Sequence, residues 1–94
     1  MSIAVLTLHL RLPGCSSLKE KRGHIKPILA RLRREFNVAT AEIGLQDQWS
    51  EAVLACVTIS ADPNQNHRLL LQAAGFVERS WPNLEVIDQR IELI

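Results

Sequence analysis

The chain has 94 residues, of which 47% are hydrophobic and 22% are charged, and its net charge is +1. This length supports one hydrophobic core and not two, so we expect a single domain over residues 1–94. The composition excludes a disordered chain, and a membrane-spanning helix is excluded because no run of about 18 apolar residues occurs.

The N-terminal residues MSIAVLTLHLRLPG lack a basic start and a small-residue cleavage site, so we do not expect a signal peptide. The two cysteines, Cys15 and Cys56, form no CxxC motif and indicate no disulfide framework. These observations favour a cytoplasmic protein.

The first predicted element is a strand over residues 3–12, IAVLTLHLRL. Its residues alternate in polarity, which is typical of a strand buried on one face. Leucines at positions 6, 8, 10 and 12 should point to the core, and Thr7, His9 and Arg11 should point away from it. Pro13 and Gly14 end the strand.

A helix is predicted over residues 18–36. Ser17 is a good N-cap, and Glu20 three residues later suggests a capping box in which each side chain accepts a free backbone N–H. Pro27 falls inside the helix but on its polar side, so we expect a bend and not a break. The helical spacing of the apolar residues defines the buried stripe, which consists of Leu18, Ile25, Ile28, Leu29, Leu32 and Phe36.

The second half of the chain is also predicted to consist of strands and a helix. Two strands joined by a short loop are typical of a hairpin. A second helix should begin with Asp62 as N-cap and Pro63 at its first position, and it should end near Trp81. The predicted strands are residues 38–45, 51–60 and 84–94.

The order of the elements is therefore βαββαβ. With right-handed crossovers this order produces a four-stranded antiparallel sheet with both helices on one face, the ferredoxin-like sandwich of the α+β class. Many unrelated functions use this fold, so it does not by itself indicate an activity.

Charge is distributed unevenly along the chain. Residues 18–36 carry seven of the eleven Lys and Arg residues and two acids, a net charge of +5, and the rest of the chain carries −4. On a helical wheel most of these cations gather along one edge of the apolar stripe. Such an edge favours binding to a phosphate backbone or to an acidic protein, but it is also typical of a solvated face that maintains solubility. The candidate binding residues are Lys19, Lys21, Arg22, Lys26 and Arg33.

The sheet face opposite the helices has no cover within the chain. The first and third predicted strands contain no aromatic residue, so we do not expect bases to stack on this face as they do in RNA-recognition domains. Aliphatic side chains there favour a homodimer in which this face of one copy packs against the same face of the other copy. The residues predicted for this dimer face are Ile3, Val5, Leu54 and Cys56.

No pattern of catalytic residues stands out. The three histidines at positions 9, 24 and 67 lack metal-site spacing, and the four glycines are isolated. Cys15 precedes a helix start, where a thiolate would be stabilised, but an inert loop cysteine is the simpler interpretation. We therefore expect no enzyme, no metal, no cofactor and no small-molecule ligand.

Two segments carry a family resemblance. The helix start SLKEKR at residues 17–22, followed by NVATAEIGLQDQWSEAVLACVTIS at residues 37–60, resembles the YlxP-like family of small bacterial proteins. The resemblance implies a ferredoxin-like fold and a domain of unknown function without established catalytic residues. Genes of this family often lie near those for translation initiation and ribosome maturation factors, which implies a role around the ribosome.

Two hypotheses follow. In the first, the protein is a non-enzymatic binding protein that contacts RNA or a ribosomal component through the basic helix edge. In the second, it is a dimeric structural or regulatory interaction module with no nucleic-acid role, and Lys21 and Arg22 pair with acids such as Glu42 or Asp47. The contacts of these cations in the folded chain distinguish the two.

Overall fold

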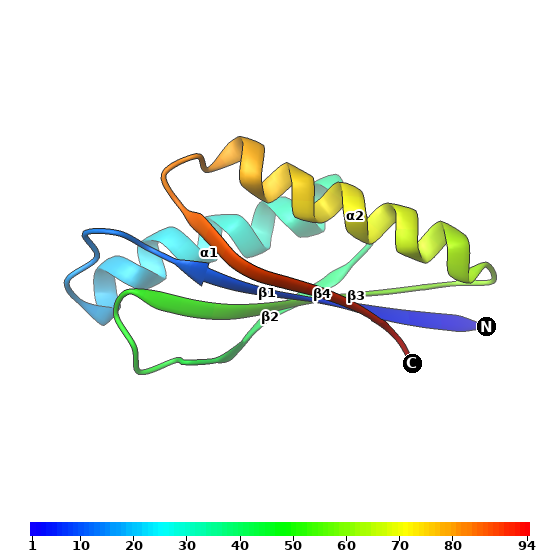
Figure 1. Ribbon diagram of the computed structural model, residues 1–94, viewed down its shortest axis with the longest axis horizontal. Helices are drawn as coiled ribbons and strands as arrows, with labels where there is room; N and C mark the ends of the chain where they lie inside the picture. Colours follow the sequence, from blue (N-terminus) through cyan, green and yellow to red (C-terminus); the bar gives the residue numbers. More distant parts are fainter.

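The computed structural model describes residues 1–94 and shows the predicted order of elements (Figure 1). The sheet has the strand order β2-β3-β1-β4, and every neighbouring pair is antiparallel. The predicted ferredoxin-like sandwich is therefore confirmed. The elements are β1 (Ser2–Arg11), α1 (Leu18–Glu35), β2 (Ala39–Gly44), β3 (Glu51–Ser60), α2 (Pro63–Ser80) and β4 (Glu85–Leu93).

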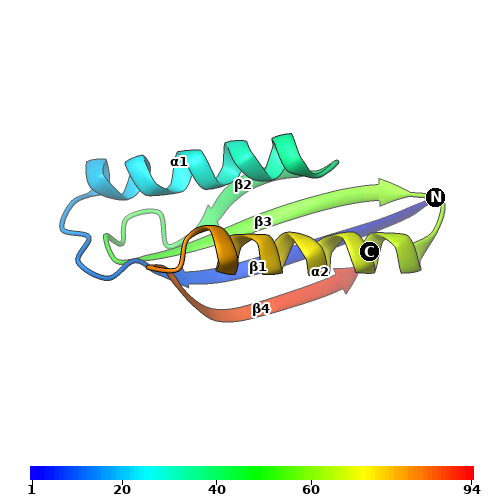
Figure 2. The ribbon, with the colours of Figure 1, turned by 90° about the horizontal axis from the view of Figure 1, so that it is seen from above.

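Both helices cover the same face of the sheet. Helix α1 packs against β2, and α2 lies over β1, β3 and β4. Figure 2 shows α1 running along the β2 side of the molecule, so that this helix and the edge strand β2 form one flank. Neither helix is both long and apolar enough to cross a membrane.

The helix starts follow the sequence with one difference. Ser17 caps α1 by accepting the backbone N–H of Glu20 at 3.1 Å. The Glu20 carboxylate, however, accepts the backbone N–H and the hydroxyl of Ser16 instead of closing a capping box on Ser17. These two hydrogen bonds lower the pKa of Glu20. Helix α1 continues through Pro27, whose exposed position leaves the buried stripe intact, as predicted.

The core lies between the sheet and the helices. The inner face of β1 contributes Leu6, Leu8 and Leu10, which are fully buried, and Leu12 follows them just after the strand. Helix α1 contributes the predicted Ile25, Ile28 and Leu32, and α2 contributes Leu70 and Val77.

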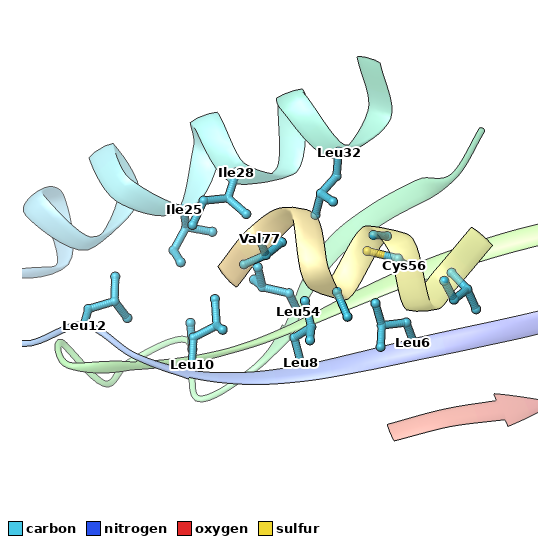
Figure 3. Packing of buried hydrophobic residues seen from close by; sticks show 14 of the residues in the cluster. Leu6, Leu8, Leu10, Leu12, Ile25, Ile28, Leu32, Leu54, Cys56 and Val77 are labelled. Atoms are coloured by element: carbon cyan, nitrogen blue, oxygen red, sulfur yellow. The ribbon is translucent and has the colours of Figure 1, made fainter. Parts of the chain in front are cut away.

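The predicted dimer face was wrong for two of its four residues. Leu54 and Cys56 are fully buried and point to the helices together with Leu6 and Leu8 (Figure 3). The register explains this, because Leu54 lies opposite Leu8 and Cys56 lies opposite Leu6, and directly opposite residues share one face of the sheet.

The open face of the sheet carries the alternate residues instead. Ile3 and Val5 project there from β1, as predicted, opposite Ile59 and Val57 of β3. Towards β2 the face continues with small side chains, and towards β4 it becomes charged. We call this surface the open face, and its apolar part consists of Ile3, Val5, Ala39, Ala41, Val53, Ala55, Val57 and Ile59.

Candidate functional site

The basic edge predicted from the sequence lies on the β2 side of α1. Arg33 fixes this orientation, because its guanidinium donates a 2.8 Å hydrogen bond to the Thr40 hydroxyl on β2. At about 100° per residue, Lys19, Arg22 and Lys26 lie on the same side of the helix as Arg33, and all are exposed to solvent. We call Lys19, Arg22, Lys26 and Arg33 the cationic row.

Lys21 does not belong to this surface, so its prediction as a surface binding residue was wrong. Its side chain is only 2% exposed, and its ammonium lies 2.9 Å from the Glu42 carboxylate of β2. That carboxylate oxygen meets no hydrogen-bond geometry, so the contact is an ion pair. The Lys21 hydrogen bond goes instead to the Leu45 carbonyl, at 2.7 Å. Lys21 thus ties α1 to the β2–β3 hairpin.

The ion pairs of the basic residues agree with each of the two functional hypotheses in part. Lys21 pairs with Glu42 as the second hypothesis expected, but Arg22 has no acidic partner. The same holds for Lys19 and Lys26, which make no ion pair or side-chain hydrogen bond within the chain. Most of the row is therefore free to meet an external anion.

The hairpin loop between β2 and β3 is fixed against the start of α1. Leu45 adopts a left-handed backbone with φ of 56°, which is unusual for a residue other than glycine. Its carbonyl accepts hydrogen bonds from Lys21 and from the Gln48 N–H. At the other end of the loop, the Ser50 carbonyl accepts the Leu12 N–H at 2.7 Å, close to the connection that leads into α1.

Three of the four aromatic residues pack against one another. Phe36, at the end of α1, packs edge to face on Phe76 of α2, and Phe76 packs edge to face on Trp81 at the end of α2. The Arg31 guanidinium lies over Phe76 and Trp81. Trp49 is the exception. It is 54% exposed in the hairpin loop and takes part in neither pair.

The other reactive side chains lie apart from one another. His9 contacts Glu51 at 2.7 Å on the open face, and Cys15 lies 3.6 Å from the Ser17 carbonyl in the β1–α1 connection. Burial raises the pKa of the Cys56 thiol to about 11, which keeps it protonated and unreactive at neutral pH. No three side chains of the His, Cys, Asp and Glu types come together as a metal site.

Comparison with known proteins shows the family to which the chain belongs. A family model described as a protein of unknown function (DUF503) matches residues 3–91. The chain belongs to this family. It is also 37% identical over 76 residues to the uncharacterised protein YlxP of Bacillus subtilis (strain 168), across 81% of this chain and 82% of that protein. The YlxP-like resemblance is thus confirmed. The residues matched by the family model include helix α1 and the β2–β3 hairpin.

Proposed function

We propose that this DUF503 protein is a non-enzymatic binding protein that contacts RNA, in a ribosomal setting, through the cationic row of α1. The observation that carries the proposal is the row itself, in which Lys19, Arg22 and Lys26 are exposed without an acidic partner. Cations that neutralise phosphates release counterions from the nucleic acid, and this release drives sequence-independent binding.

The spacing of the row suits a backbone that runs along the helix. A rise of about 1.5 Å per residue separates Lys19 from Arg33 by roughly 21 Å along the helix axis. Helix α1 is held to β2 by the Arg33–Thr40 hydrogen bond and the Lys21–Glu42 ion pair, so the cations lie on a supported helix and not on a loop. This rigidity supports positioning of several phosphates at once.

Charge reversal of the row tests the proposal. We expect the triple variant Lys19→Glu/Arg22→Glu/Lys26→Glu to lose co-sedimentation with purified ribosomes and binding to a labelled RNA, because the variant repels phosphates. The matched control is Arg68→Glu/Arg79→Glu/Arg90→Glu, which makes the same change in net charge at exposed sites elsewhere. Equal loss in both variants, or no loss in the first, would contradict the assignment to the row.

The open face favours a second candidate function, that of a homodimeric interaction module. Ile3, Val5, Val57 and Ile59 lie together there, and nothing within the chain covers them. An apolar surface of this kind on a small domain favours a partner, and a two-fold axis would let one copy cover another. The dimer and the cationic row occupy different surfaces, so one function does not exclude the other.

We expect gel filtration with light scattering to give a dimer mass for the wild-type protein at micromolar concentration. Val5→Glu/Val57→Glu should give a monomer, because two charges would be buried without partners in the interface. Leu71→Glu, an exposed apolar position on α2, is the control and should stay dimeric. A wild-type monomer, or a dimer that survives the double substitution, would refute the predicted interface.

A further inference from the structure

We propose that Trp49 stacks on an unpaired base of the RNA whose backbone follows the cationic row, which makes single-stranded RNA the preferred ligand. This inference rests on the proposed function and names the class of RNA. It assigns a role to the one aromatic side chain that the fold leaves without packing partners.

The indole of Trp49 is available for such a contact. It is 54% exposed, lies outside the hydrophobic core and the aromatic pairs, and its N–H donates to no group of the protein. The other tryptophan, Trp81, packs edge to face on Phe76. Trp49, in contrast, makes no such packing contact, so packing does not explain why an indole stands at this position.

The loop that carries Trp49 is anchored close to the N-terminal end of α1, where the cationic row begins. Ser50, the next residue, is hydrogen-bonded to Leu12, which lies six residues before α1. The opposite end of the loop is held by the hydrogen bond between Lys21, in the first turns of α1, and the Leu45 carbonyl. Both anchors hold the loop beside the helix end that carries Lys19 and Arg22. In the proposed complex, a strand that leaves the row at this end meets the indole.

The surroundings of Trp49 suit a base and not a phosphate. The ring lines a shallow hollow together with Asp47, Gln48 and Ser50. The amide and hydroxyl can exchange hydrogen bonds with a base edge, and the carboxylate can accept from an amino or imino group. Asp47 would repel a phosphate. In the proposed complex the base therefore stacks on Trp49, and the phosphate backbone contacts the cations of the row.

This division discriminates between forms of RNA. In a duplex the bases are stacked on each other and their faces are closed to an indole, whereas in a single strand they are free to stack on an aromatic side chain. We therefore expect tighter binding to an unstructured 12-nucleotide RNA than to the blunt duplex formed from the same strand.

Fluorescence tests the contact directly. In a Trp81→Phe background Trp49 is the only tryptophan, and its emission should be quenched saturably by the single strand and not by the duplex. In anisotropy titrations of the labelled single strand, Trp49→Ala should weaken binding by between about fivefold and a hundredfold. Trp49→Phe should retain most of the affinity, and Leu71→Ala, an exposed apolar control on α2, should retain all of it.

The outcomes separate this inference from the proposed function. Salt-dependent RNA binding with no quenching of Trp49, or equal affinity for single strand and duplex, would overturn stacking and leave the cationic row as the binding surface. Loss of affinity in Trp49→Ala with an unchanged dependence on salt supports stacking, because the phosphate contacts are then intact. Absence of any RNA binding by the wild-type protein would overturn both.

Discussion

Replacement of Lys21 by methionine is expected to lower the free energy of unfolding by about 3 kcal/mol, the low end of the range for breaking a buried ion pair. Methionine keeps most of the apolar stem but removes the ammonium, which leaves the Glu42 carboxylate without its countercharge. The low end of the range applies because the Glu42 side chain keeps 20% exposure. The loss also removes one of the two hydrogen bonds to the Leu45 carbonyl, which keeps only the Gln48 N–H as a donor and holds the hairpin loop less firmly against α1.

Urea denaturation measures this effect, and a double variant isolates its cause. Replacing both partners of a buried pair by apolar residues is often close to neutral, so Lys21→Met/Glu42→Leu should recover most of the stability lost by Lys21→Met alone. If the single variant unfolds within about 1 kcal/mol of the wild type, or if the double variant is no more stable than the single one, the ion pair is not what holds α1 to β2.

The second large effect is expected at Leu54. Its side chain is fully buried opposite Leu8, under the helices, so Leu54→Ala should cost about 2–5 kcal/mol through lost burial and the cavity left behind. Val53→Ala is the matched control, because Val53 is the adjacent residue on the open face and is only partly buried. Its cost should be clearly smaller.

Thermal and urea unfolding of the two variants decide which face of β3 is the inner one. A larger loss of stability for Val53→Ala than for Leu54→Ala would mean that Val53, and not Leu54, lies on the inner face of the strand. The same comparison explains why a charge at Leu54 is unsuitable as a probe of the dimer, since it would unfold the protein before it tested any interface.

The sequence was sufficient for the order of the elements but not for the orientation of β3. The alternation in residues 3–12 and the caps at Ser17 and Asp62 are local signals, and the structure agrees with them. In the segment EAVLACVTIS apolar residues occupy both sets of alternate positions. Its inner face is decided only by the pairing with β1, a contact between residues far apart in the chain.

Sequence reasoning left two roles open for Lys21, a surface binding residue or a partner of acids such as Glu42 or Asp47, although one signal favoured the second. Lys21 stands at helical spacing before Ile25, Ile28 and Leu32, so it occupies the buried stripe. A lysine there requires a nearby acid, and Glu42 lies 21 positions away on another element. Sequence patterns identified a basic helix edge, but only tertiary packing separates its structural cation from the exposed ones.

The dependence of RNA affinity on salt is the most direct measurement of the central claim, which is that the cationic row contacts phosphates. If the four cations of the row bind a single strand, the logarithm of the association constant should fall with the logarithm of salt concentration with a slope of about −3. Lys19→Glu/Arg22→Glu/Lys26→Glu should bring this slope close to zero and abolish measurable affinity at moderate salt, while Arg68→Glu/Arg79→Glu/Arg90→Glu should keep the wild-type slope. An unchanged slope in the first variant, or a wild-type affinity that does not respond to salt, would contradict the account.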